Sequence, residues 1–112
     1  DALSEFMEDI AKVEVIIGHN INFDRHVVGC ELYRLNGAYN ALMNKDYICT
    51  MLSSINYCAI PSNSFLGGYK WPKLEELYRK LFGHMFDNAH DALADVSATK
   101  ECYFELRKKR IL

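Results

Sequence analysis

Along the first half of the chain, the spacing of hydrophobic and polar positions changes from a helical period to short β-branched runs. The apolar residues near the start lie three or four positions apart, which predicts one amphipathic helix with a stripe of Leu3, Phe6, Met7 and Ile10. Residues 13–17 are mostly β-branched and lead to Gly18, so we expect a short strand that ends in a turn. Residues 23–36 favour a second helix, which Asn36-Gly37 ends, and residues 38–45 favour a further helical turn.

In the second half, the pattern predicts one more strand and two well-delimited helices. Residues 47–51 favour a strand, and residues 59–70 have the Pro, Ser, Asn and Gly content of a loop. Pro72 is expected at the first position of a helix that Gly83 ends. The last helix is expected over residues 91–108, with a core face formed by Ala92, Val96, Thr99, Tyr103 and Leu106. This order of elements predicts an α/β fold, although two strands are too few for a self-sufficient sheet.

Size and composition indicate one packed domain, residues 1–112. Half of the residues are hydrophobic, which is typical of a globular core and not of a disordered segment. No apolar run approaches the length of a membrane span, so we expect a soluble protein without a membrane contact. The net charge of -2 excludes a general polyanion-binding protein, and the basic residues 107–110 suit the end of a helix.

The four cysteines indicate the redox state of the compartment in which the protein is expected. Cys30, Cys49, Cys58 and Cys102 include no C-x-x-C pair, and their spacings match neither a disulfide framework nor a zinc ribbon. A structural zinc module is therefore disfavoured. Free thiols of this kind are typical of a reducing compartment, so we expect a cytoplasmic protein.

Two polar clusters carry candidate chemistry. The first, residues 18–24 (Gly-His-Asn-Ile-Asn-Phe-Asp), follows the first expected strand, and ligand sites of open α/β sheets gather at that edge. The second, residues 90–95 (His-Asp-Ala-Leu-Ala-Asp), spans a loop and a first helical turn, so that His90 and Asp95 can face one crevice. Taken singly, Asp24 and Asp91 are equally well explained as helix caps, and Asn20 as a turn residue.

Taken together, the two clusters resemble the second and third motifs of the DEDDh family of 3′–5′ exonucleases, which includes the proofreading epsilon subunit of bacterial replicative DNA polymerase. The pattern N-x-x-F-D at residues 20–24 is followed about 66 residues later by H-x-A-x-x-D at residues 90–95. Residues 48–51 and 73–83 are similar to the strand and the helix that the family has between these motifs. The resemblance covers nearly the whole chain and implies a ribonuclease H-like fold.

This resemblance implies hydrolysis of phosphodiester bonds from 3′ ends. In such a site, four carboxylates hold two divalent ions, Mg²⁺ or Mn²⁺, about 4 Å apart. By the family pattern Asp24 and Asp95 would be metal ligands, and His90 would take the proton from the attacking water. Asn20 and Phe23 would shape the pocket around the terminal nucleotide. The implied partners are single-stranded or frayed 3′ ends of DNA, in preference to RNA, and a DNA polymerase subunit.

One family feature is absent from the sequence. No Asp in the chain has Glu two residues later, whereas the family's first motif, D-x-E, supplies two of the four carboxylates. The family also places about three strands before the helix at which this chain starts. We therefore expect the C-terminal part of a catalytic domain that lacks its first strands and is inactive alone.

The missing motif leaves both function and assembly with alternatives. The alternative to an exonuclease is a non-catalytic nucleic-acid-binding or partner-binding fragment of the same fold, and an upstream D-x-E strand would discriminate the two. Without a neighbouring strand, the edge near Val15 and the apolar face of the first helix would be open. We expect the chain to self-associate, or to pair with the missing segment, through these surfaces.

Overall fold

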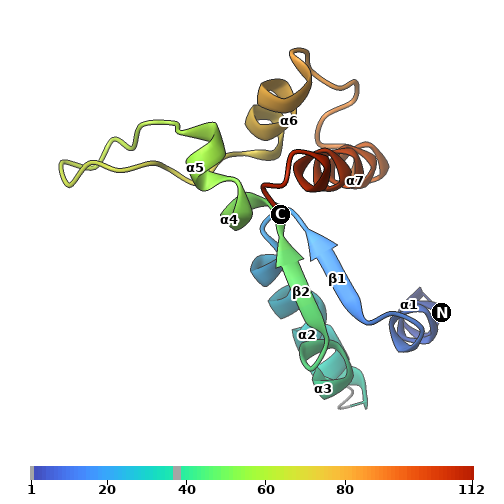
Figure 1. Cartoon of the computed structure of the whole chain (residues 1–112). Coiled ribbons are helices and arrows are strands. Elements are labelled where there is room, and N and C mark those ends of the chain that lie inside the picture. The colour runs from blue at the N-terminus through green and yellow to red at the C-terminus, as the bar shows by residue number, and fades with distance from the viewer. Residues whose placement is uncertain (1, 37–38) are drawn as a thin grey trace.

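The computed structural model describes residues 2–36 and 39–112, and within them it shows a mixed α/β fold with a small parallel sheet and seven helices (Figure 1). The α/β class expected from the sequence is confirmed. Gly37 and Ala38 lie outside the described residues. The helix Ile21–Asn36 stops where Asn36-Gly37 was expected to end it, and Tyr39–Met43 forms the helical turn expected over residues 38–45. In chain order the elements are α1 (Ala2–Ala11), β1 (Val15–Gly18), α2 (Ile21–Asn36), α3 (Tyr39–Met43), β2 (Asp46–Cys49), α4 (Thr50–Ser53), α5 (Ile55–Cys58), α6 (Leu74–Phe82) and α7 (Ala92–Lys108).

The two strands of the sheet are parallel, because α2 and α3 carry the chain back to the start of the sheet between them. Val15 pairs with Asp46 and Gly18 with Cys49, so both strands end at the same edge. The second strand is shorter than predicted, since Thr50 and Met51 already belong to α4. The Cys49 thiol accepts a hydrogen bond from the backbone N–H of Leu52 at 3.5 Å and caps that helix.

The N-terminal half of the molecule, made of α1, β1, α2, α3 and β2, has its own small core. Ile10, Leu32 and Leu42 are buried there, and the predicted apolar stripe of α1 packs against them. The stripe is therefore covered by the chain's own α2 and α3 residues. Two surfaces were expected to be open for association. In the described residues, the edge of β1 that does not pair with β2 is still open.

The C-terminal half, made of α5, α6 and α7, has a separate core. The residues that α7 buries there are Ala98, Cys102 and Leu106. The predicted core face of this helix is thus wrong except for Leu106: Val96 is 65% exposed, because the helix is rotated by about one residue from the expected orientation. Burial raises the pKa of the Cys102 thiol to about 12, so this cysteine stays protonated and serves packing.

The start of α6 lies two residues later than predicted. Lys73 is the N-cap of this helix, and its backbone N–H donates to the Glu76 carboxylate at 2.9 Å. Pro72 therefore precedes the cap, and its carbonyl is free to accept a bond from elsewhere in the fold. The predicted end at Gly83 is confirmed: its φ of 79° is the left-handed conformation that glycine adopts readily.

The loop expected over residues 59–70 is confirmed and extends as an arm away from the two cores (Figure 1). Pro61 and Tyr69 form an isolated antiparallel bridge across it. The short helices α4 and α5, which the sequence pattern did not predict, lead into this arm. In the part of the chain that the structure describes, the helices are too short or too polar to cross a membrane.

Candidate functional site

A cavity of about 660 Å³ lies at the carboxyl end of β1, between the N-terminal and C-terminal halves. This is the end of a parallel sheet at which ligands bind in open α/β folds. On one side the cavity is lined by Ile17, Gly18, His19, Ile21 and Asp24. On the other side it is lined by Leu74 of α6 and by Asp95, Val96, Thr99, Lys100, Tyr103 and Phe104 of α7.

Asp24 and Asp95, the two expected metal ligands, both line this cavity. Each lies in the first turn of its helix, Asp24 in α2 and Asp95 in α7. Partial burial raises the pKa of the Asp24 carboxyl, because desolvation disfavours its charged form. The fold therefore brings one carboxylate from each sequence motif to the same space.

His90, the expected proton acceptor, is close to Asp95 through its backbone. Its N–H donates to the Asp95 carboxylate at 3.1 Å, and its φ of 77° is left-handed. Its imidazole, however, is not among the groups that line the cavity: the side chain is 86% exposed, and Nε2 lies 3.6 Å from the Glu75 carboxylate of α6. Asp91 caps α7 by accepting a bond from Ala94 N–H at 3.1 Å.

Asn20 and Phe23, the residues expected around a terminal nucleotide, do not line the cavity. Asn20 forms the turn between β1 and α2 with a φ of 63°, a conformation that asparagine tolerates better than most residues. Its carbonyl accepts a bond from Phe23 N–H at 3.1 Å. Phe23 is 65% exposed in the first turn of α2, so it is not a core residue either.

His19, to which the sequence pattern assigned no role, makes the longest-range polar contacts of the site. Its Nδ1 lies 3.0 Å from the hydroxyl of Thr50, and its Nε2 lies 2.8 Å from the carbonyl of Pro72. Thr50 is fully buried, and its hydroxyl also lies 3.3 Å from the carbonyl of Gly18. The pKa of His19 is lowered, chiefly by burial, against the opposing effects of the Pro72 hydrogen bond and of Glu75.

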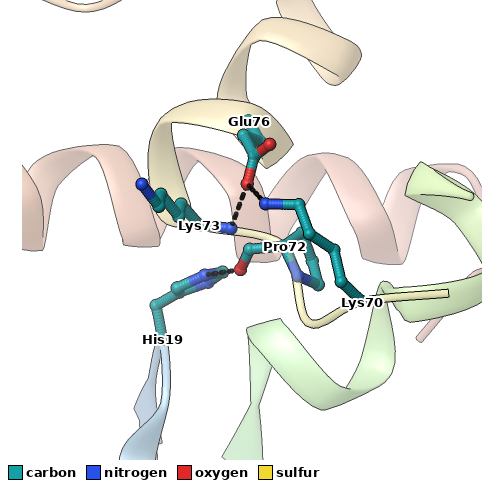
Figure 2. Close-up of polar contacts among 5 residues, drawn as sticks. All are labelled: His19, Lys70, Pro72, Lys73 and Glu76. Carbon is teal, nitrogen blue, oxygen red and sulfur yellow. Dashed lines mark hydrogen bonds and ion pairs between the residues drawn. The ribbon is translucent and has the colours of Figure 1, made fainter. Parts of the chain in front are cut away.

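The segment that contains Pro72 is held by its own network of polar contacts. Figure 2 shows the Glu76 carboxylate between the Lys70 ammonium, at 2.7 Å, and the backbone N–H of Lys73, at 2.9 Å. Burial alone would raise the pKa of Glu76. The hydrogen bonds from Lys70 and Lys73 outweigh this effect, so the pKa of Glu76 is lowered. The Pro72 carbonyl, which faces His19, therefore lies in a segment that is bonded to α6 on both sides of Pro72.

Apart from Asp95, the wall formed by α7 is the part of the site that sequence reasoning missed. Val96, Thr99 and Tyr103 have the helical spacing of a buried stripe, and the structure places that stripe on the cavity. Lys100 supplies the only cation among the residues described as lining the cavity, and Phe104 is 59% exposed. A helical period identifies an apolar face, but it does not tell a core from an open cavity.

The described residues bring an incomplete set of metal ligands to the cavity. Within residues 2–36 and 39–112, no group of three or more His, Cys, Asp or Glu side chains could hold an ion. Two carboxylates on one cavity do not make the four-carboxylate site that the sequence resemblance implies. The described residues therefore do not fit a complete two-ion centre.

No family model, no curated protein and no solved structure matches this chain.

Proposed function

We propose that this chain forms one side of a 3′–5′ exonuclease site of the DEDDh type, in a ribonuclease H-like fold, and that its cavity receives the 3′-terminal nucleotide of single-stranded or frayed DNA. The observation that carries the proposal is that Asp24 and Asp95, one from each motif, line the same cavity at the carboxyl end of β1.

The other walls of the cavity suit a nucleotide. Tyr103 and Phe104 offer aromatic faces to a base, which favours stacking without sequence preference. Lys100 offers an ammonium group to a phosphate. The chain's own residues would thus bind and orient the terminal nucleotide, and the overall charge of -2 restricts the contact to this local site.

Catalysis would need more carboxylates than this chain brings to the cavity. Mg²⁺ or Mn²⁺ is the cofactor of this proposal, and the missing ligands would come from a polypeptide segment outside these 112 residues. The chain by itself is expected to release no nucleotides from a 3′-labelled single strand above a no-protein control, with either ion. Release that survives repurification and disappears in Asp95→Asn would contradict this expectation.

Binding can be tested on the chain as it is. A short single-stranded oligodeoxynucleotide should shift the NMR amide resonances around Asp24, Asp95 and Tyr103. Asp46→Asn is the matched control, because Asp46 is exposed at the opposite end of the sheet, where it pairs with Val15. Tyr103→Ala should weaken binding, while Asp46→Asn leaves it unchanged. Shifts scattered over the surface, or equal in Tyr103→Ala, would count against the cavity as the nucleotide site.

The role of His90 can be tested in a complete enzyme, in which a D-x-E segment restores activity. There, His90→Ala should reduce turnover by roughly two to four orders of magnitude, the usual size of a general-base contribution. The ring would have to leave Glu75 and turn toward the cavity, because His90 lies beside Asp95 only through its backbone. A rate within a few-fold of the unmodified enzyme would rule out the proton-acceptor role.

A non-catalytic fragment of the same fold, which binds nucleic acid or a partner protein, is the second candidate. The incomplete set of metal ligands favours it. The two candidates differ in one measurement: oligonucleotide binding without any activity, even after a D-x-E segment is supplied, would support the non-catalytic function.

A further inference from the structure

The cavity lies between two halves that have separate cores, so its shape depends on how the halves are joined. The short helix α4 contacts β1 and β2 on one side and α5 and α7 on the other. His19 adds a second connection. It lies just after β1, bonds to Thr50 at the start of α4, and bonds to Pro72 just before α6. His19 also lines the cavity itself.

Counting hydrogens assigns the proton on Nε2 of the His19 ring. The Pro72 carbonyl can only accept, so Nε2 must carry a proton to make the 2.8 Å contact. In the neutral ring Nδ1 is then an acceptor, and the Thr50 hydroxyl donates to it at 3.0 Å. Thr50 has a single hydroxyl hydrogen, so it could donate to the Gly18 carbonyl at 3.3 Å only if Nδ1 donated to Thr50, which would require a charged ring. Burial of the ring disfavours that charged form. The neutral ring therefore makes two directed bonds, one to Thr50 at the start of α4 and one to Pro72 just before α6.

We propose that His19 is a positioning residue, which in its neutral Nε2–H form joins the β1–α2 turn to Thr50 and to Pro72 and so sets the spacing of the two cavity walls. The turn that it holds carries Asn20 and leads to Asp24. The segment that it reaches leads directly to Leu74, on the opposite wall. The part of this inference that concerns a bound nucleotide rests on the proposed function, whereas the joining role does not.

Burial favours the neutral form of the ring, against the opposing charge of Glu75. Glu75 of α6 is the charged group whose field reaches the imidazole. Asp24 of α2 and Asp95 and Lys100 of α7 share the cavity with it, while α4 contributes the uncharged Thr50. Enclosure by these elements disfavours a charged ring.

The ring form can be read directly from the imidazole ¹⁵N resonances of the whole chain at neutral pH, assigned by their loss in His19→Gln. The expected result is a protonated Nε2 and an unprotonated Nδ1 that accepts a hydrogen bond. In Thr50→Val the Nδ1 resonance should lose the signature of that bond, and in Thr50→Ser, which keeps a hydroxyl, it should retain it. A ring that is protonated on Nδ1, or that interconverts freely between its two neutral forms, would overturn the assignment.

The joining role has a built-in reporter, because Trp71 is the chain's single tryptophan and directly precedes Pro72. In His19→Gln the amide nitrogen can replace Nε2 and still donate to the Pro72 carbonyl. In His19→Asn it can reach only the place of Nδ1. Trp71 fluorescence should therefore resemble the unmodified chain in His19→Gln and change in His19→Asn. Equal spectra for both variants would contradict the joining role. The control is His84→Gln, because His84 is an exposed loop residue.

The oligonucleotide separates this inference from the proposed function. If the ring form and the Trp71 difference are as expected, but the unmodified chain binds no oligonucleotide, the proposed function fails and the positioning role stands. If the unmodified chain binds and His19→Asn binds equally well with an unchanged Trp71 spectrum, the positioning role fails. Weaker binding in His19→Asn than in His19→Gln is the outcome expected when both hold.

Discussion

At the scale of single residues, His19 shows how a fold can oppose the ordinary chemistry of a side chain. An exposed imidazole gains a proton near pH 6.5. In this chain burial lowers the pKa of His19, and the Pro72 carbonyl and Glu75 offset only part of that effect. The native ring is thus held in the form that can accept from Thr50 and donate to Pro72 at once.

This lowered pKa predicts how stability depends on pH. Between the folded pKa and about 6.5, the unfolded chain binds more protons at His19 than the folded chain does, so the contribution of His19 to stability decreases as pH falls through this window. Urea unfolding between about pH 7.5 and 5 should show a decrease that His19→Gln removes in part. His26→Gln, at an exposed position of α2, should keep the decrease of the unmodified chain. An identical pH dependence in His19→Gln would show that the ring is not desolvated.

At the scale of elements, α7 has two functions on two faces. Ala98, Cys102 and Leu106 form its core face, and Val96 and Tyr103 belong to its cavity face. Substitutions on the two faces should therefore separate stability from binding.

The core face is expected to dominate the free energy of unfolding. Leu106 is fully buried, so Leu106→Ala should destabilise the chain by roughly 2–5 kcal/mol through lost burial and a residual cavity. Leu93→Ala, on the same helix at a 75% exposed position, should change the unfolding free energy by no more than about 0.5 kcal/mol. Denaturant unfolding followed by circular dichroism measures both. Equal losses in the two variants would contradict the observed orientation of α7.

The cap of α7 links this helix to the site. Asp91 accepts from Ala94 N–H, and the turn just before it places the His90 N–H on Asp95. Asp91→Ala should cost about 0.5–2 kcal/mol, and Asp91→Asn, which can still accept that bond, much less. The same unfolding measurement, together with the amide resonance of His90, tests whether losing the cap also releases the Asp95 contact. If Asp91→Asn lost as much stability as Asp91→Ala, the charge of Asp91, and not its hydrogen bond, would be what stabilises the helix.

At the scale of the whole molecule, the chain is more extended than a typical domain of its size. Its radius of gyration is 15.6 Å, whereas about 13 Å is usual for a compact domain of this length. The arm of residues 59–70 and the separation of the two cores both contribute. In the described residues β1 pairs only with β2, which leaves its other edge with unpaired backbone groups.

This free edge is expected to promote self-association. Val15 and Ile17 of β1 are 40% and 37% exposed, so the strand presents apolar side chains to solvent. Neither residue carries a charge that would prevent pairing with another chain. Sedimentation at micromolar concentration should show dimers or larger species, and Val15→Lys should shift them toward the monomer. Val27→Lys, which adds the same charge at a 50% exposed position of α2, should not. A monomeric unmodified chain with protected β1 amides would show that the edge is covered.

The sequence alone determined the features that depend on neighbours within a few residues. The stripe of α1, the end of α6 at Gly83 and the cap of α7 at Asp91 follow from helical period and backbone preference, which act locally. The resemblance of the two motifs also led to Asp24 and Asp95, which line one cavity.

Only the tertiary structure decided which face of α7 is buried, where β2 ends and what His19 contacts. Helical period marks an apolar stripe on α7 without telling a core from a cavity, since both favour the same side chains. Thr50 has the β-branched form of a strand residue, yet it starts α4, which Cys49 caps, and its hydroxyl is buried against Gly18 and His19. His19 finds its partners 31 and 53 residues away in the chain. Contacts at such separations arise from the packing of the two halves, which no local pattern of residues encodes.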